Sequence, residues 1–316
     1  MKKNILVCGA SGFVGTNICK RLVLNKNFRI YAIYFSNKPK IKYNKNIVWI
    51  RSDLRQLNNC LKLTKNKDII IQCAATTSGS NDILLHPYLH VTDNAVMNSY
   101  LLKASYVNNA KHFIFTSCTV MYPHSNKPLT ETEFDEKKIF TSYYGVAHTK
   151  LYVEKISKFF SDISDTKFTI IRHSNLYGPH DKFDIKKGHF IGSSIKKIFD
   201  MSKSVKINGS GKEKRDFLYI DDFLDFLDKV IRKQHQKFQI FNCTYGKSFS
   251  VVDVLSKLIN LSGVKKKVVH YMKRKNINVN ILVSSRKAEK QLGWKPIFTL
   301  NRGLKKTIQW YKNEIN

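Results

Sequence analysis

The first half of the chain alternates short apolar runs with segments of helical spacing. The apolar runs have the length and composition of buried strands, and they lie at 4–10, 29–35, 47–54, 68–75, 112–118 and 167–178. The segments between them that indicate helices lie at 14–25, 93–108 and 148–161. Because strands that alternate with helices form parallel sheets, the pattern predicts an α/β fold built on a parallel sheet.

The second half of the chain continues without a visible break. Further helices are expected at 191–203, 221–233 and 250–262, and neither a low-complexity linker nor an internal repeat separates the halves. A chain of 316 residues is long enough for one large domain or two modest ones. We predict a first domain over 1–172 and a smaller lobe over 173–316 that is interwoven with it.

Composition indicates an ordinary globular protein. Hydrophobic residues make up 42% of the chain, and no apolar run reaches the roughly 18 residues of a membrane helix. The segment MKKNILVCGASG resembles a signal peptide only superficially, because glycines interrupt its apolar run, so we interpret it as a first strand. Six scattered cysteines without a CxxC pair favour neither a metal site nor disulfides. We expect a soluble protein of the reducing cytoplasm.

The net charge of +32, from 55 basic and 23 acidic residues, raises the question of a nucleic-acid partner. The lysines are spread along the whole chain, with short clusters at 265–267 and 273–275. No basic arm or aromatic-interleaved patch stands out. We therefore interpret the charge as solvation of exposed faces that also suits anionic substrates, and we expect no nucleic-acid partner.

A glycine motif carries the first chemical signal. Gly9, Gly12 and Gly15 in GASGFVG lie between the first predicted strand and its helix. Glycines at this spacing permit a tight turn, close approach of a pyrophosphate and close packing of helix on strand, with phosphate at the helix N-terminus. The motif predicts a dinucleotide site.

The residues at the end of the second predicted strand distinguish an NAD site from an NADP site. An acidic residue there binds the ribose hydroxyls of NAD, whereas a basic residue favours NADP. The sequence YFSNKPK has no carboxylate, and Ser36, Asn37 and Lys38 suit a 2′-phosphate, so we expect NADP(H) more than NAD(H). Asp53 and Leu54, after the third strand, suit the flanks of an adenine ring, although Asp53 equally suits a helix cap.

The chain resembles the extended short-chain dehydrogenase/reductases, and within them nucleotide-sugar reductases and epimerases of the GDP-L-fucose synthase type. The resemblance spans nearly the whole chain and rests on GASGFVG, CAATTSG, TSCTVMYP, NLYGPHDKFD, GHF, GSGKEKRDFLYIDD and KQLGWKP. It implies a Rossmann-type doubly wound parallel sheet with a smaller, mostly C-terminal α/β substrate lobe, and a homodimer formed through two helices of each subunit. The cofactor-binding residues expected from the motifs and the resemblance are Gly9, Ser11, Gly12, Phe13, Val14, Gly15, Lys38, Asp53, Leu54, Ala74, Ala75 and Lys150.

The chemistry implied by the resemblance needs a tyrosine whose pKa is lowered by a lysine on the same helix face. A spacing of four residues brings two side chains within about 40° of each other, but the six residues between Tyr144 and Lys150 separate them by about 240°. Counting back from NLYGP aligns Lys150 with the family lysine and puts Val146 at the tyrosine position. Three readings remain: Tyr144 reaches the site through an irregular first turn, His148 is the partner of Tyr144, or the site is inactive.

Two further positions depart from the family. Cys118 stands where the family has a serine or threonine, with Ser117 and Thr119 beside it. The family histidine that inverts carbons 3 and 5 corresponds to His189, but Val120 replaces its cysteine partner, which puts epimerisation in doubt. The expected catalytic residues are Tyr144, Lys150, Ser117, Cys118 and His189.

The resemblance also assigns the substrate contacts. Asn175, Lys197 and Arg215 match residues that hold a nucleoside diphosphate sugar, and the fork of an arginine suits a diphosphate. We predict an NADPH-dependent reductase, with or without epimerisation, of a nucleotide-activated 4-keto-6-deoxysugar. The alternatives are an NAD-dependent nucleotide-sugar 4-epimerase or dehydratase and, from another class, a non-catalytic relative that binds nucleotide or nucleic acid.

Overall fold

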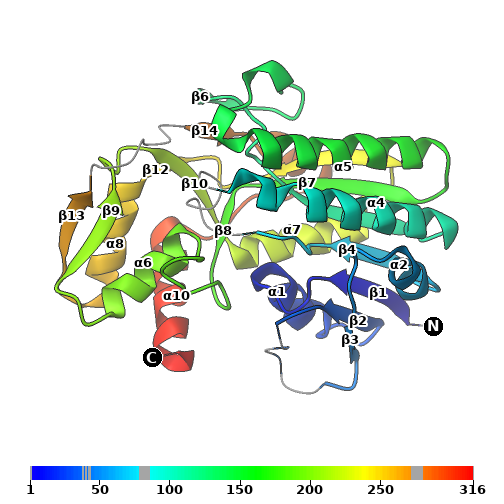
Figure 1. Cartoon of the computed structure of the whole chain (residues 1–316), viewed down its shortest axis with the longest axis horizontal. Coiled ribbons are helices and arrows are strands. Elements are labelled where there is room, and N and C mark those ends of the chain that lie inside the picture. The colour runs from blue at the N-terminus through cyan, green and yellow to red at the C-terminus, as the bar shows by residue number, and fades with distance from the viewer. Residues whose placement is uncertain are drawn as a thin grey trace.

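A parallel sheet of seven strands forms the centre of the protein (Figure 1). The computed structural model describes residues 2–37, 39, 41, 44–77, 86–271 and 280–315. The strand order is β11-β7-β5-β4-β1-β2-β3. The strands are β1 (Lys3–Cys8), β2 (Phe28–Tyr34), β3 (Ile47–Arg51), β4 (Ile69–Gln72), β5 (His112–Cys118), β7 (Lys167–His173) and β11 (Phe238–Cys243).

The strand order reverses direction at β1, which pairs in parallel with β2 on one side and with β4 on the other. Ligands of doubly wound sheets bind outside the carboxyl ends of the strands at such a reversal. The glycine turn after β1 and the ends of β4, β5 and β7 meet at this edge. The predicted fold class, a Rossmann-type doubly wound sheet, is confirmed.

Helices cover both faces of the sheet because successive strand residues point to opposite sides. Leu6 and Ile70 pack on one face and Ile5 and Ile71 on the other, all nearly fully buried. The first face carries α2 (Leu57–Thr64), α4 (Thr92–Val107) and α5 (Tyr144–Asp162), and the second carries α1 (Phe13–Leu22) and α7 (Ile220–Lys233) (Figure 1). Short 3₁₀ turns precede α4 and α5, at Pro87–His90, Glu136–Lys138 and Thr141–Tyr143.

A second lobe lies at the carboxyl side of the sheet (Figure 1). Its strands are β8 (Asn175–Tyr177), β10 (Lys214–Tyr219) and β12 (Ser248–Ser250) in one small sheet, and β9 (Ser204–Asn208) with β13 (Lys267–Tyr271) in another. Its helices are α6 (Phe190–Phe199), α8 (Val251–Ser262) and α10 (Leu300–Glu314). β6 (Ser125–Leu129) pairs with β14 (Ile281–Val283), and α9 (Arg286–Leu292) packs against β11.

Two features of the sheet differ from the sequence prediction. The run 167–178 was expected to be one strand, but it divides at Ser174 into β7 in the main sheet and β8, which pairs with β10 in the other lobe. β11, which the sequence pattern did not reveal, returns to the main sheet beside β7. The chain therefore crosses between the two lobes more than once. Within the described residues, no helix is both long and apolar enough to cross a membrane.

Candidate active site at the carboxyl edge of the sheet

The turn after β1 fits a dinucleotide. Gly9 has φ +75°, and a Cβ there would lie 2.6 Å from the Ala74 Cα; a Cβ on Gly15 would lie 2.2 Å from the Gly9 carbonyl oxygen. Gly12 is the N-cap of α1, and no side chain caps its amides. Free amides at a helix N-terminus bind a pyrophosphate, so backbone packing requires Gly9 and Gly15, while Gly12 leaves room for the ligand. Around them, Ser11 is buried, and Phe13 and Val14 are partly buried.

Alanine substitutions should distinguish the packing role of Gly15 from the ligand-binding role of Gly12. We expect Gly15→Ala to lower the free energy of unfolding by about 1–3 kcal/mol, because its Cβ would overlap backbone atoms. Gly12→Ala should leave stability almost unchanged, since its Cβ would meet a single protein atom at 3.3 Å, yet weaken NADPH binding. Chemical denaturation and fluorescence titration measure both quantities, and equal effects of the two variants on stability would contradict this assignment.

Asp53, after β3, is engaged by a neighbouring arginine. Arg55 donates to both carboxylate oxygens of Asp53, at 2.9 Å and 3.0 Å, and to Asp93 at 3.0 Å. These hydrogen bonds lower the pKa of Asp53. Leu54 is buried, and Lys38, expected at a 2′-phosphate, lies outside the described residues. Asp53 is thus fixed by Arg55 before any ligand arrives.

Lys150 reaches the carboxyl edge of β5. Its Nζ donates to the Thr116 carbonyl oxygen at 2.9 Å and lies 4.6 Å from the centre of the Phe115 ring. Burial lowers the pKa of this ammonium, and the nearby Cys118 and Glu154 raise it in part. Lys150 is therefore held against the carboxyl end of β5.

Tyr144 points away from Lys150. The regular helix α5 begins at Tyr144, so no irregular turn absorbs the extra residues, and the two side chains lie about 240° apart around the axis. Tyr144 is 60% exposed and packs on the His148 ring at 4.2 Å. Nε2 of His148 is buried and has no hydrogen-bond partner among the described residues. The geometry separates Tyr144 from Lys150 and places it against His148 instead.

Ser117 and Cys118, the two catalytic candidates on β5, point to opposite faces of the sheet. Ser117 is fully buried, and its hydroxyl donates to Glu154 at 2.7 Å, within the ion pair that Glu154 forms with Arg172. Cys118, the next residue, is partly exposed and lies near Lys150; burial raises the pKa of its thiol more than Lys150 lowers it. The structure thus assigns Ser117 to the interior and leaves Cys118 at the site.

The remaining predicted site residues come from several elements of the second lobe. His189 is the N-cap of α6, with its side chain 56% exposed and Nδ1 3.5 Å from an Asp181 oxygen. Asn175 donates to the Asp216 carbonyl at 2.9 Å, and the Arg215 guanidinium lies 5.9 Å from the centre of the Phe190 ring. Lys197 donates to the Lys206 carbonyl at 3.3 Å, which ties it to the lobe itself.

The comparisons with known proteins agree with this geometry. The model of the NAD dependent epimerase/dehydratase family matches residues 5–244, which is more than half of the chain. The chain belongs to this family. Membership confirms the predicted enzyme class, an NAD(P)-dependent nucleotide-sugar enzyme.

Several known proteins are similar to this chain over 77% of its length or more. GDP-L-colitose synthase of Yersinia pseudotuberculosis is 27% identical over 99% of both chains. GDP-L-fucose synthase of Azorhizobium caulinodans is 25% identical over 77% of this chain and 80% of its own. The structure of a UDP-glucose 4-epimerase from Thermotoga maritima superposes with a TM-score of 0.87, at 23% identity, over 99% of this chain and 100% of its own.

The sequence analysis did not identify His173, a titratable residue at the carboxyl edge of the sheet. His173 ends β7, and its strand register pairs it with Cys118. Its position directly after a buried strand and before NLYG was the available signal.

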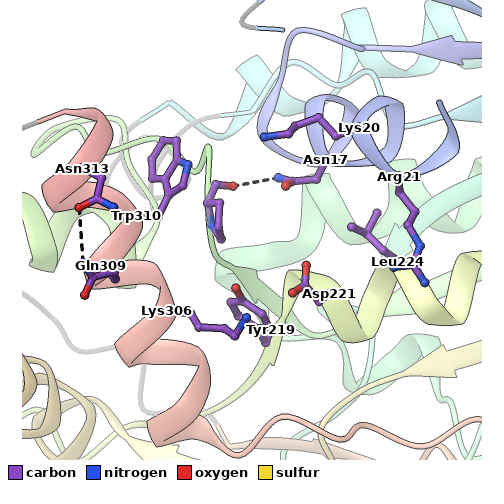
Figure 2. A pocket seen from close by; sticks show the side chains of 11 residues that line it. Asn17, Lys20, Arg21, Tyr219, Asp221, Leu224, Lys306, Gln309, Trp310 and Asn313 are labelled. Atoms are coloured by element: carbon purple, nitrogen blue, oxygen red, sulfur yellow. Dashed lines mark hydrogen bonds between the residues drawn. The ribbon is translucent and has the colours of Figure 1, made fainter. Parts of the chain in front are cut away.

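A cavity of about 460 Å³ lies elsewhere, between α1, α7 and α10 (Figure 2). Lys20, Lys306 and Trp310 line it, together with Asp221. None of the site residues predicted from the sequence lines this cavity.

Proposed function

We propose that this enzyme uses NADPH to reduce the 4-keto group of a nucleotide-activated 4-keto-6-deoxysugar. Lys150, held at the edge of β5 beside Cys118, is the observation on which the proposal rests, because it is the cation that this chemistry needs near the nicotinamide. The similarity to GDP-L-colitose synthase along the whole chain supports this substrate class. NADPH, when bound, supplies the hydride.

The residues of the chain have separate tasks in this proposal. Gly12 and the first amides of α1 hold the pyrophosphate, and Lys150 stabilises the oxygen at carbon 4 as charge develops on it. Arg215 and Asn175 hold the sugar nucleotide. Val120, at the position of the family cysteine, packs with an apolar cluster and cannot exchange a proton, so we propose reduction without inversion at carbons 3 and 5.

The proposal is tested by following NADPH absorbance with a panel of GDP-, dTDP-, CDP- and UDP-4-keto-6-deoxysugars. We expect NADPH consumption with at least one of them. A second candidate, an NAD-using 4-epimerase, is favoured by the fold similarity to 4-epimerases and would interconvert UDP-sugars without net consumption of NADPH. Tight NADPH binding without turnover of any sugar would favour the non-catalytic alternative.

The predicted preference for NADPH can be tested by substitution of Arg51. No carboxylate follows β2, where Phe35 is 49% exposed, and Arg51 donates through Nε to the Phe35 carbonyl at 3.2 Å. Its guanidinium therefore lies beside the expected ribose. We expect Arg51→Ala to weaken NADPH binding about tenfold and to leave NADH binding unchanged, as the loss of about one charge-assisted hydrogen bond. Titration of both cofactors measures this, with Arg29→Ala, at the opposite end of β2, as control; equal losses for both cofactors would contradict it.

A homodimer is the second prediction of this section. Tyr144, Tyr152 and Phe159 lie within about 80° on the outer face of α5, and each is 41% to 60% exposed. Tyr106 and Val107 extend the apolar surface over α4. Such a patch on a soluble protein favours association, here with a second copy. Phe159→Glu should convert a dimer into a monomer in light scattering, whereas Lys62→Glu on α2 should not; a wild-type monomer would contradict the prediction.

A further inference from the structure

His173 lies at the carboxyl edge of the main sheet, beside a residue that the sequence nominated, Cys118 on the neighbouring strand. It is the last residue of β7, and its register with Cys118 on the adjacent parallel strand puts both side chains on the same side of the sheet edge. Lys150 and His189 are within electrostatic range of its imidazole, and both add to the effect of burial in lowering its pKa. The ring is partly exposed and packs edge-to-face on Phe223 at 5.8 Å.

The hydrogen bond of His173 fixes its tautomer. Nδ1 lies 2.8 Å from the Ser174 carbonyl oxygen, which can only accept, so Nδ1 carries the hydrogen. Burial, with Lys150 and His189, lowers the pKa of His173 to about 4, which keeps the imidazole neutral at neutral pH. Nε2 therefore carries a lone pair that can accept from a hydroxyl group, within electrostatic range of Lys150.

Other proton-exchanging side chains near Lys150 are less suitable. Tyr144 points outward and Ser117 is buried in an ion pair, while Val146 occupies the position of the family tyrosine. Tyr143 lies in the 3₁₀ turn Thr141–Tyr143 before α5, about two turns ahead of Lys150 along the chain. Cys118 and His173 are thus the titratable groups near Lys150 at the ends of β5 and β7, and because burial raises the pKa of the Cys118 thiol, His173 is the better proton acceptor of the two.

We propose that Nε2 of His173 exchanges the proton of the sugar oxygen that is oxidised or reduced, in place of the tyrosine. This inference rests on the proposed function. In the oxidative direction, the C–H bond at carbon 4 breaks and its hydride goes to the nicotinamide, while the O–H bond breaks and its proton passes to Nε2, leaving a ketone. In the reductive direction, the carbon takes the hydride, and the oxygen takes a proton that Nε2 has received from solvent.

The test compares His173→Gln, which accepts a hydrogen bond but no proton, with the matched surface variant His235→Gln. We expect kcat for His173→Gln to fall about 10²- to 10⁴-fold in both directions, with KM for the sugar and the Kd for NADPH unchanged. Tyr143→Phe, Tyr144→Phe and His235→Gln should stay near wild type. Near wild-type turnover of His173→Gln, or a collapse in Tyr143→Phe with intact NADPH binding, would overturn the proposal.

If the wild type turns over no sugar, the proposed function fails. A second measurement then still tests the role of His173. Nitrogen NMR of histidine-labelled protein, assigned with His173→Gln, reports the tautomer and surroundings of the ring. We expect an unprotonated Nε2 at neutral pH whose resonance shifts when NADP⁺ and a nucleoside diphosphate are added together. A protonated Nε2, or no shift with saturating ligands, would overturn the inference.

Discussion

Replacing Lys150 by methionine should lower kcat by about 10²- to 10⁴-fold while the protein still folds. The Lys150 ammonium is held by the Thr116 carbonyl at the edge of β5, next to Cys118 and His173, so its charge acts where the sugar oxygen is expected. Methionine keeps most of the side-chain volume and removes a cation whose burial is unfavourable. Steady-state kinetics and a thermal melt of the same preparation measure both effects.

The matched control for this variant is Lys62→Met, on the exposed side of α2. It removes one of many surface lysines and should leave kcat, KM and the melting temperature unchanged. Full activity of Lys150→Met would remove Lys150 from the mechanism. A large loss of melting temperature would instead identify its contact with Thr116 as structural.

Replacing Glu154 by alanine should lower the free energy of unfolding by about 3–5 kcal/mol. The side chains of Glu154 and Arg172 are 3% and 4% exposed and form an ion pair at 2.7 Å. Glu154 also accepts from Ser117, and Arg172 donates to the Tyr122 hydroxyl at 2.8 Å. Removal of the carboxylate leaves a buried guanidinium without its charged partner, and chemical denaturation measures the cost.

A surface ion pair on the same helix provides the control. Lys158 and Asp162 are four residues apart on α5 and more than half exposed. Asp162→Ala should change the free energy of unfolding by no more than about 1 kcal/mol. If Glu154→Ala and Asp162→Ala lowered the free energy of unfolding by similar amounts, the buried pair would not have the stabilising role assigned to it.

Local pattern was sufficient for much of the fold. The apolar runs that became β1, β4 and β5 are buried on both faces and bounded by turns, so their type and position could be predicted from the sequence. β11 was missed because its run, FQIFNC, mixes polar and apolar residues, and only its pairing with β7 makes it a sheet strand. The division of 167–178 at Ser174 was missed because sequence does not show that β8 pairs with β10.

Site residues could be predicted from the sequence only where one local motif or a fixed distance along the chain defines their position. The steric need for Gly9 and Gly15 follows from the motif, and the structure places Lys150 at the sheet edge where the alignment on NLYGP put its family equivalent. The direction of Tyr144 depended on the residue at which α5 begins, which the sequence left open. For His173 the only sequence signal was its position before NLYG, because the neighbours that give it importance, Cys118, Lys150 and His189, come from other elements.

The most direct test of the central claim is transfer of deuterium from NADPH labelled at its transferable position to the sugar. The enzyme would be incubated with the panel of nucleotide 4-keto-6-deoxysugars, and the products examined by mass spectrometry and NMR. The account predicts one deuterium at carbon 4 of the reduced sugar, formed by wild type and not by Lys150→Met. Products without deuterium, or no product from any sugar although NADPH binds, would contradict it.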